Sequence, residues 1–243
     1  MIDWIKPKIF DDNKIIAGVT KRNLSSYFPY GFTISQAQIA GREEVLRNRN
    51  LLAEELGIKS NLMIFQKQVH GDVIRKVSKG DDNNAETDGM ITTEKGVILN
   101  ISIADCAGVL IWDSVNDIIC GIHSGWKGTS LNIVGKGIQK LIDEFESKSE
   151  NLYVYISPCA GGNAYEVGEE VAKFFPRSIK LKSRNKYLFD NKNEILHQLL
   201  DMKIPIANIE ISDICTISDE NFHSYRRDAD FSGRMSAFIG MRI

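Results

Sequence analysis

The amino-acid sequence predicts an α+β fold, a single mixed-sheet domain with helices packed on layered sheets, spanning residues 1–243. Short apolar runs with strand character occur between segments with the spacing of amphipathic helices, and several expected strands follow one another directly. The chain has 243 residues and is 43% hydrophobic, so it can bury a sizeable core. Neither an internal repeat nor a low-complexity linker divides the sequence.

The expected centre of the fold is the segment 97–129, which contains three apolar runs. The runs cover residues 97–103, 109–112 and 118–122 and are typical of buried strands. Cys106 follows the first run, and His123 follows the third, seventeen residues later. That spacing accommodates a strand, a turn and a returning strand, so we expect the thiol and the imidazole to meet at one edge of a sheet.

The other elements are expected on both sides of this segment. Apolar runs predict strands at residues 15–20, 62–66, 152–156, 209–214 and 235–239, with a further short strand after Asp88-Gly89. Apolar residues at helical spacing predict helices at residues 42–56, 129–145, 168–175 and 191–202. Gly57 and Pro176 supply stop signals for two of these helices. The basic stretch 177–190 has no pattern that predicts an element.

Composition and charge exclude several classes of protein. With 30 basic and 32 acidic residues the net charge is −2, so the chain lacks the basic excess of nucleic-acid or membrane-surface proteins. No apolar run reaches the roughly 18 residues that span a bilayer, and the first residues have no signal-peptide pattern. The four cysteines form no C-x-x-C pair. We therefore expect a cytoplasmic enzyme without a disulfide framework.

Three potential metal ligands, His70, Cys106 and His123, each follow an expected strand. Each has glycine or another small residue within two positions, which leaves room for a ligand. Two imidazoles and a thiolate suit a tetrahedral zinc site whose fourth position is open to water or substrate. Spacing alone leaves a second interpretation open, in which a core cysteine and two histidines bonded to backbone carbonyls have structural roles only.

Two of these residues also fit a nucleophilic enzyme. Cys106 activated by His123, with Asp105 or Asp88 orienting the imidazole, would form a Cys-His hydrolase. Such an enzyme has no need of His70, whereas a metal site does. Asp105 fits two further roles, as support for a metal-ligating histidine or as the cap of a turn.

An anion is expected near the same segment. Residues 123–129 lead directly into an expected helix, whose first N–H groups and dipole favour phosphate. The candidates for holding an anion are Lys127, Arg226, Arg227 and Arg234, and such arginines also commonly cover a surface. No Walker A pattern is present, so the sequence does not indicate binding of a nucleoside triphosphate.

The motifs around these residues resemble those of the laccase-domain family. They are QVHG at 68–71, ADC at 104–106, HSGWKGT at 123–129, SPC at 157–159, YEVG at 165–168, SYRRD at 224–228 and GRMS at 233–236. Members of that family are described variously as multicopper polyphenol oxidases, peptidoglycan editing factors and purine nucleoside phosphorylases. The matching blocks occur in the same order from about residue 45 to residue 240.

The resemblance implies a zinc-dependent purine nucleoside enzyme in which His70, Cys106 and His123 bind Zn²⁺. It implies phosphorolysis of adenosine, inosine and S-methyl-5′-thioadenosine to the free base and ribose 1-phosphate or methylthioribose 1-phosphate, with adenosine deamination as a further activity. The expected catalytic residues are Cys106, His123 and Asp105, and the expected substrate or phosphate binders are Arg49, Lys127, Asn48 and Arg22. The partners are small molecules, and neither nucleic acid nor a membrane is expected. The alternative is a Cys-His amide hydrolase acting on peptidoglycan precursors.

Some positions depart from the pattern of the family. Ser124 and Lys127 replace the alanine and arginine of the usual HAGWRG motif, and Arg22 is followed by Asn23-Leu24 where paired glycines are usual. Ala107-Gly108 replaces the usual residue and proline after ADC. The three metal ligands are retained, so these departures concern the substrate range. A lysine provides a point charge and not the bidentate fork of arginine.

Oxidase chemistry of the laccase type does not fit this composition. Several copper ions need many histidine ligands, and the chain has four histidines in all. One site with two histidines and a cysteine is also expected to bind Cu²⁺ in vitro, because affinity rises towards Cu²⁺ along the divalent series. Such a site cannot assemble a multicopper cluster, and we therefore exclude true laccase activity.

Overall fold

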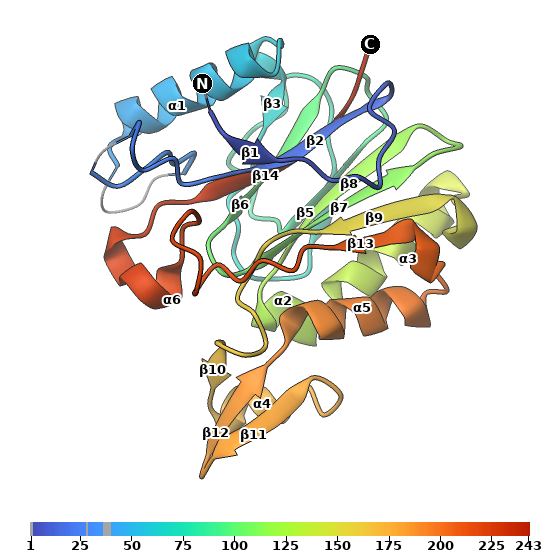
Figure 1. Cartoon of the computed structure of the whole chain (residues 1–243). Coiled ribbons are helices and arrows are strands. Elements are labelled where there is room, and N and C mark those ends of the chain that lie inside the picture. Colours follow the sequence, from blue (N-terminus) through green and yellow to red (C-terminus); the bar gives the residue numbers. More distant parts are fainter. Residues whose placement is uncertain (1, 28, 36–39) are drawn as a thin grey trace.

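The computed structural model describes residues 2–27, 29–35 and 40–243 and confirms the α+β fold class. Two β-sheets are stacked on each other, helices cover the outer side of each, and a third, small sheet projects at one end (Figure 1). The boundaries of a single domain at residues 1 and 243 stay a prediction.

The first sheet has five strands in the order β1-β2-β14-β6-β3. Their bounds are Trp4–Ile5 for β1, Ile15–Thr20 for β2, Met235–Met241 for β14, Ile98–Ile103 for β6 and Met63–Ile64 for β3. All neighbours are antiparallel except β3 and β6. The last strand of the chain thus lies in the middle of the sheet, and its first residue, Met235, pairs with Ile103. This register brings the segment before β14 next to the residues that follow β6.

The second sheet has six strands in the order β13-β9-β7-β8-β5-β4. Their bounds are Ile209–Ile211 for β13, Leu152–Ile156 for β9, Ala107–Asp113 for β7, Ile118–Ser124 for β8, Gly89–Thr92 for β5 and Ile74–Lys76 for β4. Along β7, Leu110 and Trp112 face the core between the two sheets, whereas Val109 and Ile111 face the core beneath the helices. Burial on both faces explains why the central strands appear in the sequence as continuous apolar runs.

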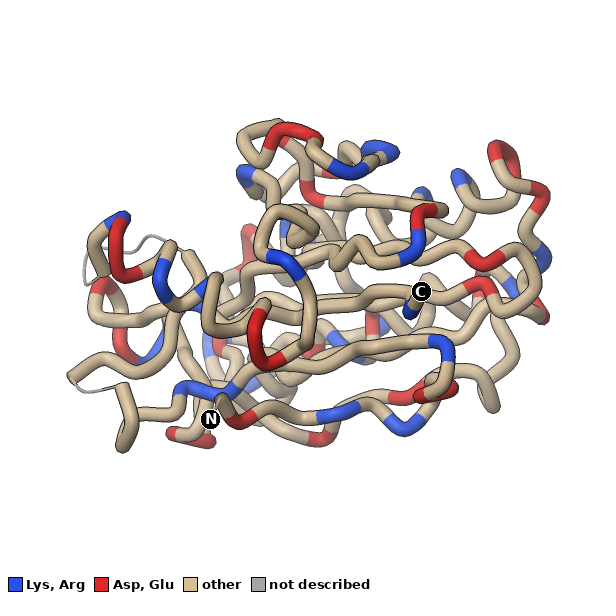
Figure 2. The backbone as a smooth tube through the Cα atoms, turned by 90° about the horizontal axis from the view of Figure 1, so that it is seen from above, with Lys and Arg blue, Asp and Glu red and all other residues tan. Residues whose placement is uncertain are grey.

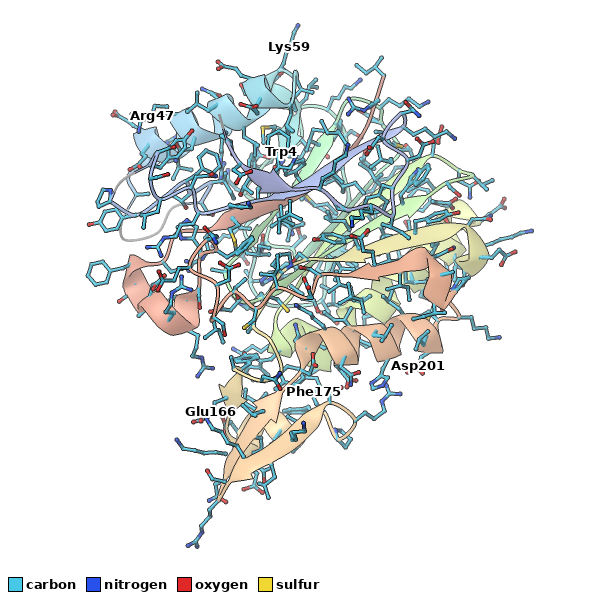
Figure 3. The ribbon with its side chains drawn as sticks, viewed as in Figure 1. Trp4, Arg47, Lys59, Glu166, Phe175 and Asp201 are labelled. Carbon is cyan, nitrogen blue, oxygen red and sulfur yellow. The ribbon has the colours of Figure 1, made fainter. Side chains whose placement is uncertain are left out.

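Helices cover both outer faces of the stacked sheets. Helix α1 (Arg42–Glu55) packs on the first sheet, while α3 (Ile133–Phe145) and α5 (Asn191–Asp201) pack on the second (Figure 1). The side chains of Arg47 and Lys59 point away from the sheets, and Asp201 lies at the end of α5 (Figure 3). The apolar stripes of these helices therefore complete a layered arrangement of helix, sheet, sheet and helix.

The helix predicted over residues 129–145 is in fact two helices. Helix α2 (Trp126–Ser130) ends before Asn132, which has a left-handed backbone with φ of 58°, and α3 begins at Ile133. Asparagine tolerates this conformation, so the break has a local cause that the apolar spacing concealed. The remaining short elements are α6 (Tyr225–Asp228) and the 3₁₀ turns Ser60–Leu62, Ser149–Asn151, Ile206–Asn208 and Ala229–Phe231.

The small third sheet lies in a region for which the sequence predicted no strand. Its strands are β10 (Glu166–Val167), β12 (Lys186–Phe189) and β11 (Ile179–Ser183), all antiparallel, and α4 (Glu169–Ala172) packs beside them. Glu166 and Phe175 lie in this part of the molecule (Figure 3), where Phe175 stacks on Phe189 with ring centroids 4.2 Å apart. The helix predicted over 168–175 is limited to the four residues of α4.

The surface carries both signs of charge. Positions with Lys or Arg and positions with Asp or Glu are interspersed along the backbone (Figure 2), consistent with the net charge of −2. Among the helices of the described residues, none combines the length and the apolar character that crossing a membrane requires.

Candidate metal centre

The structure brings His70, Cys106 and His123 together. One potential ligand atom from each side chain lies within 4.8 Å of the other two. The rings of the two histidines meet edge to face, with centroids 4.8 Å apart and an interplanar angle of 83°. His70 is exposed, Cys106 is partly buried and His123 is buried, so the group lies where the protein interior meets solvent.

Strand pairing accounts for the meeting of Cys106 and His123. Strands β7 and β8 run antiparallel, with Ala107 opposite Ser124 and Gly108 opposite His123. Cys106 immediately precedes β7, so it lies beside the end of β8, as the spacing of seventeen residues predicted. His70 lies in the loop between β3 and β4, and its backbone is left-handed with φ of 60°.

Asp88 fixes the orientation of the His123 ring. Its Oδ1 lies 2.8 Å from Nδ1 of His123, and both residues are buried. The same carboxylate accepts the backbone N–H groups of Val69, His70 and Gly71 at 3.2, 3.0 and 2.7 Å. When Nδ1 carries the proton, Nε2 is left as the nitrogen that can bind a metal. Asp88 therefore holds two of the three candidate ligands at once.

Asp105 does not orient His123. Its Oδ1 accepts the hydroxyl of Thr216 at 2.7 Å, and its Oδ2 accepts the backbone N–H of Arg226 at 2.6 Å. The left-handed backbone of Asp105, with φ of 77°, forms the turn between β6 and β7, and its carboxylate bonds to the C-terminal segment instead. Of the two aspartates that the sequence offered for this role, the structure thus selects Asp88.

Gly125 leaves the space in which the three ligands meet. A Cβ atom at this position would lie 2.7 Å from Sγ of Cys106 and 3.2 Å from Cδ2 of His70. Both distances are shorter than ordinary van der Waals contacts, so a larger residue would displace the thiol or the ring. The glycine is required by the close approach of its neighbours, because its own backbone is extended.

The ionisation of Cys106 and His123 is coupled. Burial acts against both charged forms, but the pKa of the Cys106 thiol is lowered by the charge and hydrogen bonds of His123 and His70. The pKa of His123 is raised by the Cys106 thiolate and by Asp88, which outweigh burial. By contrast, burial raises the pKa of the Cys120 and Cys159 thiols. Cys106 is thus favoured as a thiolate, the form that binds a metal.

A buried polar network holds the loop that follows His123. The Thr129 hydroxyl donates to the backbone carbonyl of Gly125 and lies 2.8 Å from both Oγ of Ser124 and Oδ1 of Asn191. Asn191, at the start of α5, also donates from Nδ2 to the carbonyl of Ser124 at 2.8 Å. Ser124, the serine that departs from the HAGWRG motif, is therefore part of the support of the metal centre.

A cavity of about 600 Å³ opens beside the three ligands. Besides them, its lining includes the aromatic residues Trp126, Tyr165 and Tyr225 and the arginines Arg226 and Arg234. The other lining residues are Ser35, Gln66, Lys67, Gln68, Ser102, Ala104 and Asp105. Sequence reasoning named the two arginines as anion candidates but missed the aromatic residues, although YEVG and SYRRD contain both tyrosines.

The four expected substrate or phosphate binders are not among the described residues that line this cavity. Asn48 donates to the carbonyl of Thr33 at 2.9 Å, and Arg49 donates to that of Ile34 at 2.7 Å. These two side chains therefore hold the backbone just before Ser35, which does line the cavity. Arg22 donates to the carbonyl of Tyr30 and pairs with Asp228, and Lys127 is exposed above the ring of Trp126.

The other two histidines have different surroundings. His223 is buried, with Nε2 2.9 Å from the carbonyl oxygen of Phe32, while its Nδ1 accepts the N–H of Gly233 at 3.1 Å. Burial, with the nearby charges of Arg22 and Arg234, lowers the pKa of His223 to about 4. His197 lies on α5, with Nδ1 3.9 Å from Glu194. Among the described residues, the metal-ligand group contains neither of them.

Comparisons with a family profile, with known proteins and with solved structures all relate this chain to the same family. Residues 17–242 match the profile of a family described as multi-copper polyphenol oxidoreductase laccase. The chain is similar to purine nucleoside phosphorylase YlmD of Bacillus subtilis, at 28% identity over 99% of this chain and 93% of the relative. It is 32% identical to YlmD of Geobacillus stearothermophilus over 83% of this chain and 80% of the relative. The crystal structure of the Geobacillus YlmD superposes with a TM-score of 0.91, covering 99% of this chain and 96% of that one.

Proposed function

The chain belongs to the multi-copper polyphenol oxidoreductase laccase family, and from this membership and the site we propose that it is a zinc-dependent purine nucleoside phosphorylase. The observation that carries the proposal is the convergence of His70, Cys106 and His123 at the edge of a cavity of about 600 Å³. Relatives named purine nucleoside phosphorylase support the reaction class.

The donor set fits a zinc ion. Two imidazoles and one thiolate are ligands that zinc prefers, and three protein ligands are typical of a catalytic site with an open position. Asp88 leaves Nε2 of His123 available, and Gly125 leaves room between the ligands. When bound there, zinc supplies a Lewis acid beside the cavity. The same ligands can also take up copper, because imidazole and thiolate suit both metals.

The cavity fits a purine nucleoside. Trp126, Tyr165 and Tyr225 present flat apolar surfaces, and a purine base can stack on such rings. The side-chain amide of Gln68 already has partners in the protein. Its NH₂ group donates to the carbonyl of Ser102 at 2.8 Å, and its oxygen accepts the N–H of Ser102 at 2.7 Å. We propose adenosine, inosine and S-methyl-5′-thioadenosine as substrates.

Phosphorolysis at this site joins two reactants. An oxygen of hydrogen phosphate forms a bond to C1′ of the ribose while the bond from C1′ to N9 of the purine breaks. The base leaves with the electron pair of that bond and takes up the proton that the phosphate gives up. The chain's contribution is to hold both reactants in one cavity and to stabilise the phosphate charge. We propose adenosine deamination as a further activity, in which water replaces the amino group at C6 of the base.

A second candidate is favoured by one observation. Cys106, His123 and Asp88 stand in the order thiol, imidazole and carboxylate, which is also the order in a Cys-His hydrolase. An amide hydrolase acting on peptidoglycan precursors would use these three residues. His70 separates the candidates, because a metal centre needs this ligand and a thiol hydrolase does not.

The test uses adenosine and phosphate with the zinc-loaded protein, with products separated by chromatography. Adenine and ribose 1-phosphate indicate phosphorolysis, whereas inosine indicates deamination. We expect alanine at His70, Cys106 or His123 to lower zinc content and turnover together, while Cys120→Ala changes neither. Amide hydrolysis of a peptidoglycan precursor by a fully active His70→Ala variant, without release of any base, would refute the phosphorylase and support the hydrolase.

A further inference from the structure

Two arginines line the cavity beside the metal centre without an acidic partner. Arg226 and Arg234 both belong to the lining. Within the described parts of the chain, no ion pair joins either guanidinium to an aspartate or a glutamate. Lys67, the other basic residue of the lining, pairs with Glu86 at 2.7 Å. The cavity therefore holds two cationic forks whose charge is available to a ligand.

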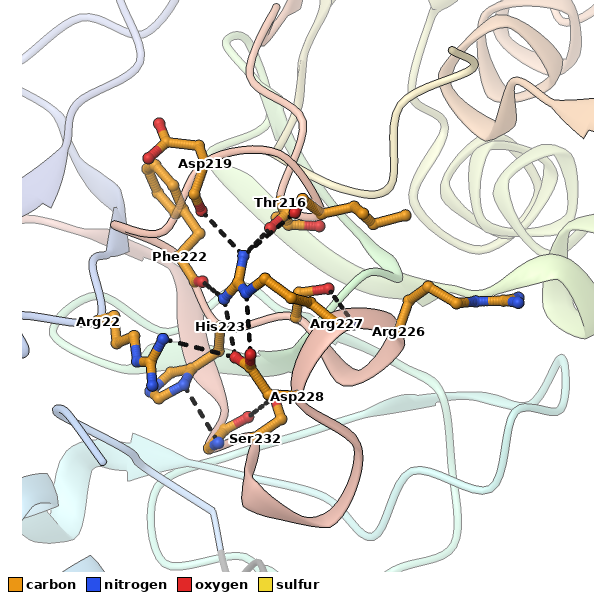
Figure 4. A network of polar contacts seen from close by, with 12 residues as sticks. Arg22, Thr216, Asp219, Phe222, His223, Arg226, Arg227, Asp228 and Ser232 are labelled. Carbon is orange, nitrogen blue, oxygen red and sulfur yellow. Dashed lines mark hydrogen bonds and ion pairs between the residues drawn. The ribbon is translucent and has the colours of Figure 1, made fainter. Parts of the chain in front are cut away.

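The neighbouring arginine, Arg227, has a structural role, in contrast to Arg226 and Arg234. Its guanidinium donates to the carbonyls of Thr216 and Phe222, each at 2.8 Å, and to the carboxylate of Asp228. Figure 4 shows Arg227 turned into this network, while Arg226 extends in another direction and its guanidinium contacts none of the residues drawn. Adjacent arginines thus have different surroundings, one bonded to protein and the other open to the cavity.

The backbone fixes Arg226 relative to the metal centre. Its N–H donates to Asp105 at 2.6 Å, and Asp105 directly precedes the candidate ligand Cys106. The guanidinium carbon of Arg226 lies 5.2 Å from the ring centre of Tyr165. The attraction between the cation and the aromatic ring helps to hold this guanidinium at the wall of the cavity.

Arg234 immediately precedes β14 and is held by the residues just before it. Its Nη1 donates to the carbonyls of Ser232 and Gly233, both at 2.8 Å, which fixes the fork and leaves its other nitrogens without a bond among the described residues. Its guanidinium carbon lies 5.6 Å from the ring centre of Tyr225. Burial lowers the pKa of Arg234, so the cation is poorly solvated and would gain from an anionic partner.

We propose that Arg226 and Arg234 form an anion subsite that binds a phosphate group beside the metal centre. Guanidinium forks bind phosphate oxygens in pairs, and such charge-assisted bonds are stronger than neutral ones. The identification of the anion as inorganic phosphate, the second substrate, rests on the proposed phosphorylase function. The subsite replaces Arg49 and Lys127 in that role, since neither lines the cavity.

The direct test is calorimetric titration of inorganic phosphate into the zinc-loaded protein. We expect Arg226→Ala and Arg234→Ala each to raise the Kd for phosphate by about tenfold or more, because each removes a charged hydrogen-bond donor. Lysine at either position should recover part of the loss, since it restores the charge without the fork. Arg47→Ala, on the outer side of α1, is the matched control and should leave Kd unchanged. Wild-type Kd in both alanine variants, with zinc content intact, would overturn the subsite.

Two further measurements distinguish failure of the subsite from failure of the proposed function, and free phosphate from a phosphate ester. If phosphate binding needs both arginines but no nucleoside is cleaved, the subsite stands and the phosphorylase function fails. If nucleosides are cleaved with an unchanged KM for phosphate in both alanine variants, the function stands and the subsite fails. Inosine 5′-monophosphate tests the source of the anion: loss of its binding with unchanged binding of inorganic phosphate would overturn the assignment to free phosphate. Should an alanine variant fail to fold, Arg226→Gln or Arg234→Gln, which removes the charge and keeps much of the side-chain length, carries the same comparison.

Discussion

Replacing Asp88 by asparagine tests how the metal centre is built. The carboxylate of Asp88 accepts three backbone N–H groups and lies 2.8 Å from Nδ1 of His123. An asparagine side chain has one oxygen and one NH₂ group, and in either orientation the NH₂ group faces two of these nitrogens. Either two donors lose their acceptor, or His123 changes its tautomer and places its proton on Nε2, the nitrogen needed by the metal.

The size of the effect follows from these contacts. These backbone donors are only partly buried, so the full cost of about 1–3 kcal/mol for each one without an acceptor is an upper limit, and we expect the free energy of unfolding to fall by at most about 2–6 kcal/mol. The loss of the carboxylate behind a metal-binding histidine lowers metal affinity by about 10–100-fold. The lost charge also lowers the stability of the metal-free protein, because Asp88 favours the charged form of His123 there.

A matched control separates stability from metal binding. Asp113 is equally buried and accepts the backbone N–H groups of Val115 and Asn116, each at 3.0 Å, but it lies outside the metal centre. Zinc affinity is measured by chelator competition and stability by denaturant unfolding of the metal-free proteins. We expect Asp113→Asn to lose stability alone and Asp88→Asn to lose both. Wild-type zinc affinity in Asp88→Asn, or an equal loss of affinity in Asp113→Asn, would refute the role given to Asp88.

Three further changes probe the site and its surroundings. Gly125→Ala should lower zinc affinity by at least about tenfold, because the new Cβ would lie 2.7 Å from Sγ of Cys106. Gly41→Ala should not, since its Cβ would meet no atom of the described residues within 4 Å. His223 has a pKa of about 4 when folded and about 6.5 when unfolded. The unfolded state therefore binds the proton first, and stability falls by up to about 3 kcal/mol as pH drops from 6.5 to 4. His223→Gln should flatten this dependence in unfolding curves recorded across that range, and an unchanged slope would exclude His223 as its source. Iodoacetamide should label Cys106 slowly in zinc-loaded protein and faster after chelation, as mass spectrometry of the peptide would detect, while the buried Cys120 stays unlabelled. Fast labelling of Cys106 with zinc bound would show that its thiolate is free.

Much of the second sheet could be predicted because its central strands are buried on both faces. The runs at 109–112 and 118–122 are apolar at almost every position, which is a strong local signal. The spacing of Cys106 and His123 then reflects a simple antiparallel pair, so their meeting followed from the chain itself. The third ligand, His70, could be identified by type but its place could not, because it sits in a loop held by Asp88.

Local sequence patterns do not predict which distant strands pair with each other. The position of β14 between β2 and β6 brings the C-terminal arginines to the cavity, and nothing in the period of its residues indicates this neighbour. The small sheet was missed because β11 is mostly exposed and alternates apolar residues with lysines, and because β12 offers an apolar run of only three residues, 187–189. The choice of Asp88 over Asp105 likewise depended on which strand ends lie together.

Residue type alone does not indicate which of the candidate cations faces the cavity. Arg49 and Arg226 are both arginines near matching motifs, but the first donates to a backbone carbonyl and stacks on Phe65, with its guanidinium carbon 3.7 Å from the ring centre. The second faces the cavity. Sequence can supply a list of cations, whereas the direction in which each side chain points is decided by its packing.

The most direct test of the proposed function is the release of hypoxanthine from inosine in the presence of phosphate. It is measured with the zinc-loaded protein, with the chelated protein and after zinc has been restored. We expect release with zinc, none after chelation and recovery on restoration, with ribose 1-phosphate formed in equal amount and no release when phosphate is omitted. Unchanged release from the chelated protein, or no release from the fully zinc-loaded protein, would contradict the assignment of His70, Cys106 and His123 as the centre of a zinc-dependent phosphorylase.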